Sequence, residues 1–173
     1  DNPLAAVERS GAGGVVVGGV DVGGLIGRSF AGRISDCYSL ADVTGGEVTG
    51  GLIGRHGASC YCATYTPGSL VRCYAAGPVA GGEHTGGLVG LNERSEVEAC
   101  FWDETVFQGG SDGGERRTTR KMNDPATFAD AGWDLSGNAF AGEGTWRLLR
   151  GKQYPRMVWE PTPGDLNGHG RTD

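Results

Sequence analysis

The sequence predicts an all-β fold, namely a β-solenoid of about three to four coils followed by a small mixed α/β C-terminal cap. Three observations support this prediction. A short apolar phrase bounded by glycines returns three times, at intervals of 27 and 36 residues. The 34 glycines lie among Val, Ile, Leu and Thr, which is typical of tight turns between short strands. Short apolar clusters separated by glycine-containing dipeptides then indicate two or three strands per unit.

The repeated phrase sets the register of the predicted coils. Stacking equivalent residues about 4.8 Å apart places them in interior columns. The phrases are Gly24-Leu25-Ile26-Gly27, Gly51-Leu52-Ile53-Gly54 and Gly87-Leu88-Val89-Gly90. We define a leucine column (Leu25, Leu52 and Leu88), an aliphatic column (Ile34, Leu70 and Val97) and a cysteine column (Cys37, Cys73 and Cys100).

The middle unit is nine residues longer than the others, which predicts an insertion within about residues 58–67. A β-propeller is the structural alternative to a solenoid. A unit of 27 residues is short for the usual four-stranded blade, so the solenoid is favoured.

The repeats predict four segments along the chain. They are an N-terminal partial coil or pairing strand (1–22), the repeats (23–108), the cap (109–160) and a linker with a loop (161–173). In the cap, Asp124 and Pro125 fit the start of a short helix that Gly132 ends. The chain begins Asp1-Asn2-Pro3 without an initiator Met, which suggests a processed piece of a longer precursor.

The partial first coil is the candidate assembly segment. Val15, Val16 and Val17 are flanked by glycines and have no earlier coil to pair with. An unpaired strand edge of this kind pairs readily with another chain, so we expect self-association.

Charge and hydropathy exclude some partners. The net charge is −6, and residues 1–110 hold the acidic excess, so nucleic acid and anionic membranes are not expected partners. No apolar stretch reaches the length of a membrane span. Only Lys121 and Lys152 are lysines, and the arginine excess favours ion pairs between neighbouring coils.

The insertion carries two further cysteines, Cys60 and Cys62. In an oxidising compartment we expect a disulfide from the insertion to the body, with Cys73 as the candidate partner. A zinc site is less favoured, because one residue between Cys60 and Cys62 is shorter than the usual ligand spacing.

An aromatic residue follows each cysteine of the cysteine column. If the cysteines point inward, this aromatic row (Tyr38, Tyr74 and Phe101) points outward. Outward rings would stack on sugars or receive another protein. Alternatively, they cover the edge of the coil or pack under the cap, and the sequence leaves both possibilities open.

No catalytic constellation stands out. The glycine phrases lack the helix that a phosphate-binding loop requires, and no nucleophile elbow is present. His56, His84 and His169 are expected in solvated turns and the tail, without ligand spacing. Adjacent Asp103 and Glu104 would face opposite sides of a strand. We therefore expect no enzyme and no cofactor.

The glycine phrases with their trailing Cys-Tyr or Cys-Phe resemble the GLUG-motif repeats of bacterial surface and secreted proteins. Residues 100–160 are similar to the segment that commonly follows such repeats. The resemblance implies an extracellular β-solenoid used for adhesion or display, without catalytic residues.

Residues 164–173 resemble the start of a dockerin-type calcium loop. Asp165, Asn167 and Asp173 fit ligand positions 1, 3 and 9. His169 stands where an oxygen ligand is expected, and the acid at position 12 is absent. A truncated connector is therefore preferred over a calcium site.

Three functions remain open, in this order. The first is a structural subunit that self-associates into a surface or filamentous assembly. The second is an adhesin or module that binds glycans or surface proteins. The third is an accessory domain of a larger secreted enzyme.

Overall fold

The computed structural model consists of two compact units, Asp1–Thr119 and Arg120–Asp173. The described residues are 5–57, 59–61, 64–135, 144–148 and 154–161.

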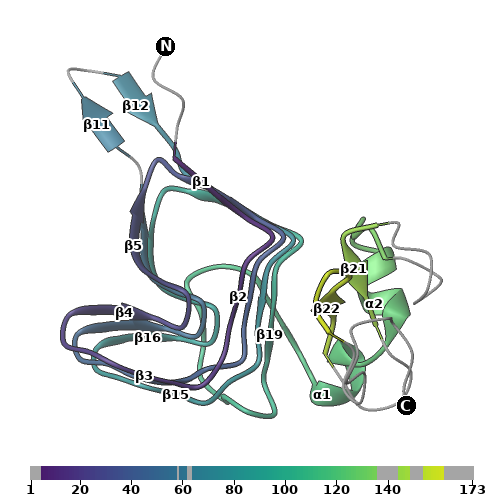
Figure 1. The fold of residues 1–173 in the computed structure, drawn as a ribbon. Helices are drawn as coiled ribbons and strands as arrows, with labels where there is room; N and C mark the ends of the chain where they lie inside the picture. Colours follow the sequence, from purple (N-terminus) through teal and green to yellow (C-terminus); the bar gives the residue numbers. More distant parts are fainter. Residues whose placement is uncertain (1–4, 58, 62–63, 136–143, 149–153, 162–173) are drawn as a thin grey trace. The chain divides into compact units, whose positions relative to one another are not determined.

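Five small parallel sheets of three to five strands form most of the first unit, and, apart from β20, neighbouring strands in each sheet come from successive repeats (Figure 1). The first sheet has the order β1 (Ala6–Glu8), β6 (Arg33–Ser35), β13 (Ser69–Val71) and β18 (Glu96–Glu98). The second has the order β2 (Gly11–Ala12), β7 (Tyr38–Ser39), β14 (Tyr74–Ala75), β19 (Phe101–Asp103) and β20 (Glu115–Arg117).

The remaining parallel sheets have three strands each. They are β3 (Val15–Val17), β8 (Asp42–Thr44) and β15 (Val79–Ala80); β4 (Asp21–Gly23), β9 (Val48–Gly50) and β16 (His84–Gly86); and β5 (Ile26–Phe30), β10 (Ile53–Gly57) and β17 (Val89–Glu93). Equivalent strands of successive repeats are always neighbours. The predicted all-β class is confirmed.

Alternating burial explains why such short strands are stable. In the first sheet the central residue of each strand is apolar, and Ile34, Leu70 and Val97 are register partners. The flanking residues are more polar and largely face away from the interior. Each three-residue strand therefore adds one apolar side chain to a shared core.

Left-handed residues turn the chain between the first and second sheets. Arg9, Asp36, Arg72 and Ala99 have φ values of 49°, 53°, 50° and 51° and occupy equivalent positions in the four repeats. A non-glycine residue in this region is uncommon. Backbone bonds to the next repeat hold three of these corners, as in the 3.0 Å bond from Asp36 N to Val71 O.

The insertion in the middle repeat forms an antiparallel hairpin. Strand β11 (Ser59–Tyr61) pairs with β12 (Thr64–Thr66). The hairpin projects from the corner between β10 and β13 (Figure 1). Because it lies outside the parallel sheets, the repeats before and after it keep the same register.

The stack of strands continues beyond the predicted end of the repeats. We expected the C-terminal segment to begin at residue 109, but β20 pairs with β19 and the compact units divide between Thr119 and Arg120. The segment between β19 and β20 crosses the edge of the third repeat. There Ser111 Oγ accepts hydrogen bonds from the Leu88 and Val89 amides at 3.1 and 3.0 Å.

The second unit contains two short helices and a strand pair. These are α1 (Thr119–Met122, which begins at the boundary), α2 (Pro125–Ala129), β21 (Trp146–Arg147) and β22 (Arg156–Met157). The predicted helix start is confirmed, because Asp124 accepts a hydrogen bond from the Ala126 amide at 3.1 Å.

Aromatic rings gather in the second unit. Trp133 lies 4.8 Å from Phe128 and 4.6 Å from Trp146 between ring centroids. In the described residues, no helix is long and apolar enough to cross a membrane. That the second unit covers an open end of the repeats stays a prediction.

Candidate functional site

The structure places each predicted interior column in a continuous stack. Leu25 N donates to Leu52 O at 3.0 Å, and Leu52 N donates to Leu88 O at 2.9 Å. All three columns belong to or pack against one apolar cluster. Leu25 and Val97, in the outer repeats, are only partly buried, because each has a neighbouring repeat on one side alone.

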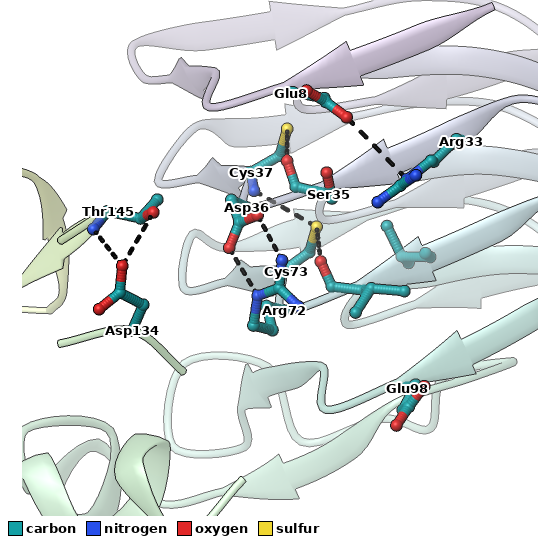
Figure 2. Close-up of polar contacts among 12 residues, drawn as sticks. Glu8, Arg33, Ser35, Asp36, Cys37, Arg72, Cys73, Glu98, Asp134 and Thr145 are labelled. Atoms are coloured by element: carbon teal, nitrogen blue, oxygen red, sulfur yellow. Dashed lines mark hydrogen bonds and ion pairs between the residues drawn. The ribbon is translucent and has the colours of Figure 1, made fainter. Parts of the chain in front are cut away.

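The cysteine column lies at the corner between the first and second sheets (Figure 2). The Cys37 amide donates to Cys73 Sγ at 3.4 Å, and the Cys73 amide donates to Cys100 Sγ at 3.3 Å. Cys73 Sγ also donates to Val71 O at 3.3 Å. Burial raises the pKa of the Cys73 thiol. Because all three thiols are buried, they serve as small core side chains.

The predicted disulfide to Cys73 is wrong. Cys37, Cys73 and Cys100 are all free thiols. Cys73 is fully buried, and it contacts both of the other cysteines of the column. The side chains of Cys60 and Cys62 lie outside the described residues.

We expect the three column thiols to resist alkylation in the folded protein. Iodoacetamide requires an exposed thiolate, and both burial and the raised pKa of Cys73 oppose this. Mass spectrometry should find all three modified after treatment in urea and none after treatment of the native chain. Native labelling of Cys73 at the denatured rate, or a disulfide-linked Cys73 peptide, would contradict this arrangement.

Ion pairs connect successive repeats, as the arginine excess predicts. Arg72 Nε and Nη2 bind Asp36 at 2.8 and 2.7 Å in a bidentate pair on the outside of the corner (Figure 2). Arg55 contacts Asp21 at 3.2 Å and Glu93 at 3.0 Å, and so spans three repeats. Such pairs favour one register between repeats.

Of the two possibilities left open for the aromatic row, the structure shows packing and not exposure to solvent. Tyr38, Tyr74 and Phe101 are only 4%, 0% and 2% exposed. Within the row, the rings of Tyr38 and Tyr74 stack with their centroids 5.3 Å apart. Gly11 lies so close to the Tyr38 ring that a Cβ at position 11 would clash with it. The Arg117 guanidinium lies 5.0 Å from the Phe101 ring centroid. These rings are packed, so they are not a display surface for sugars.

His56 was expected in a solvated turn, but it is fully buried in β10. Its register partners are Ser29 and Asn92, and Gly68 lies against its ring. Neither ring nitrogen has a hydrogen-bond partner among the described residues. Burial lowers the pKa of His56 to about 4, so the ring is neutral at physiological pH.

The N-terminal edge consists of β1 to β5, each of which pairs on one side only among the strands that the structure describes. In β3, Gly14 O accepts from Asp42 N and Gly18 N donates to Thr44 O, so these groups face β8. Because backbone direction alternates along a strand, Val15 and Val17 direct their N–H and C=O groups away from β8. Their side chains are each 74% exposed, whereas Val16 packs on the buried Val22 cluster.

Other predicted sites lie partly outside the described residues. The calcium candidates Asp165, Asn167 and Asp173 fall there, as does His169. Within the described part of the chain, no three His, Cys, Asp or Glu side chains are placed to hold a metal ion. Asp103, weighed above as a carboxylate, is buried and accepts hydrogen bonds from the Thr105 amide and the Thr119 hydroxyl at 2.8 and 2.6 Å. These bonds give it a structural role.

Residues 18–44 match the family model of the GLUG motif. The match runs from the end of β3 to the end of β8 and has the length of one repeat. The chain therefore carries a GLUG repeat, which supports its place among GLUG-repeat proteins. The match does not reach the dockerin-like segment. No curated protein and no solved structure matches the chain.

Proposed function

We propose that this chain is a GLUG-repeat β-solenoid that serves as a non-enzymatic structural module of an extracellular protein. The carrying observation is the in-register pairing of equivalent strands across five parallel sheets. A core made of stacked columns leaves its outer surface and its two ends for function. The GLUG match supports an extracellular repeat domain.

The module associates with a second copy of itself, head to tail, through the edges of two sheets. Both ends of the sheets β3–β8–β15 and β4–β9–β16 are open, since no described strand pairs with the outer sides of β3, β4, β15 and β16. Adding a copy there would repeat the pairing already present within the chain. Heterologous contacts of this type generate open filaments when they do not close.

The residues at these edges support such pairing. If the register within the chain continues across the contact, the exposed Val15 of one copy would lie beside Pro78 of the next copy. Val20 would then lie beside Glu83 of that copy. No like charges meet at either position.

A double substitution, Val15→Pro with Val17→Pro, tests the association. Proline removes the two N–H groups that face the open edge, while the bonds of Gly14 and Gly18 to β8 remain. We expect the wild type to form oligomers that grow with concentration in sedimentation experiments, and the variant to stay monomeric.

The control is a Val15→Thr and Val17→Thr variant, which keeps the edge N–H groups and should still associate. The variant chains should show the same circular dichroism spectrum as the wild type. A wild type that remains monomeric at millimolar concentration would exclude self-association and leave a module that only continues a longer solenoid.

A further inference from the structure

We propose that a cavity beside β20, lined also by the segment that connects β19 to β20, binds a neutral saccharide, a function beyond the structural role above. This terminal cavity has a volume of about 530 Å³ and is lined by residues of the 102–117 segment. Ligand sites commonly span about 300–1,000 Å³. The cavity lies wholly within the first unit.

An aromatic side chain contributes to the wall of the terminal cavity. Trp102 is a register partner of Arg116 and packs into the apolar cluster beside Leu88. Its indole lies directly against Gly87, where a Cβ would find no space. Trp102 is only 6% exposed, so it contributes a small apolar area to the cavity wall, which the C–H groups of a sugar ring can contact.

Charged groups around the cavity balance one another. Arg116 lies 3.7 Å from Glu104, and Arg117 lies 2.6 Å from Glu115. Two cations and two anions leave no positive excess, and the whole chain is acidic. An anionic ligand would therefore gain little from the local field.

The same groups suit hydroxyl ligands. Guanidinium groups only donate hydrogen bonds, carboxylates only accept them, and the Gln108 amide does both. Each hydroxyl of a saccharide donates and accepts, so a wall with both kinds of group is complementary to it. Arg116 and Gln108 are exposed and free to rotate onto a ligand.

A second cavity indicates a ligand longer than one sugar ring. It measures about 250 Å³ and shares Gln108, Gly109 and Arg116 with the terminal cavity. Glu104 lines only this second space. The two together form a continuous site suited to an oligosaccharide.

The backbone around the cavity is held in place before any ligand arrives. Gly87 N donates to Gly110 O at 2.9 Å, and Asn92 N donates to Asp112 Oδ2 at 2.7 Å. Together with the hydrogen bonds to Ser111, these contacts hold the segment between β19 and β20 against the third repeat. Such pre-organisation reduces the entropy lost on binding.

Calorimetric titration of the whole chain tests the proposal. The probes are neutral hexasaccharides of β-1,4-linked glucose, xylose, mannose and N-acetylglucosamine. We expect at least one to bind, with affinity about tenfold weaker in Arg116→Ala and in Gln108→Ala, because each loses direct hydrogen bonds. The control Arg33→Ala removes an equally exposed arginine, outside the cavity, and should bind as the wild type does.

Three results would overturn the proposal. One is that none of the four probes binds at millimolar concentration. Another is that the variants at positions 108 and 116 bind as tightly as the wild type while melting at the same temperature. The third is that only a sulfated hexasaccharide binds and that added salt abolishes its binding, which would identify an anion site.

Discussion

Replacing Gly51 with alanine is expected to destabilise the repeats strongly. A Cβ at this position would meet Gly87 O and the Ala75 side chain, the former at less than 3.0 Å. The obstructing atom is backbone of the next repeat, so it cannot rotate away. We expect a loss of about 3 kcal/mol in the free energy of unfolding and roughly 10 °C in melting temperature.

Gly19→Ala is the matched control for this prediction. Gly19 is an exposed glycine of the first repeat, and nothing lies within 4 Å of a Cβ built there. Its variant should melt within about 2 °C of the wild type, because it adds the same methyl group without a clash. Thermal unfolding followed by circular dichroism compares the two. Equal melting temperatures would show that the phrase glycines are not needed for close stacking.

The close approach at Gly51 also explains why the interior could be predicted from sequence. Stacking in register forces each repeat to place the same kind of side chain at the same position. Leu52 and Leu88 are therefore found by counting from the phrase glycines. The position and length of the insertion followed from the same counting, since only an added loop can preserve the register on both sides.

Periodicity identifies columns but not the exposure of what lies outside them. Alternation correctly separated the cysteine column from the aromatic row, but it left open whether the row faces solvent or is packed. Tyr38 and Tyr74 are buried because ring-on-ring stacking between repeats encloses each face. His56 was misplaced for another reason. It precedes the insertion, where the local pattern resembles a loop, although its register partners Ser29 and Asn92 lie on strands.

The terminal cavity could not be predicted from the repeat pattern. Strand β20 follows β19 after only a short segment and carries no glycine phrase, so its pairing with Phe101–Asp103 leaves no periodic signal. The cavity depends on that pairing, because Arg116 and Arg117 reach Trp102 only through it. The contacts of residues 110–112 with the third repeat likewise depend on tertiary structure.

Acidification is expected to weaken the fold through His56. Histidine in the unfolded chain binds a proton near pH 6.5, whereas burial lowers the pKa of folded His56 to about 4. Between these values the unfolded chain binds more protons, so stability falls as the pH falls from 6.5 to about 4. The full change corresponds to about 3 kcal/mol.

His56→Asn tests this origin of the pH dependence, because asparagine already occupies the equivalent position 92 and does not titrate. Urea unfolding at intervals from pH 7.5 to pH 4 should show a smaller stability loss in the variant, by up to about 3 kcal/mol. His56→Ser, which copies Ser29, should behave in the same way. Carboxylates titrate in all three chains, so only the difference between chains reports on His56. Parallel stability curves for the wild type and both variants would mean that the imidazole gains a proton in the folded state without cost.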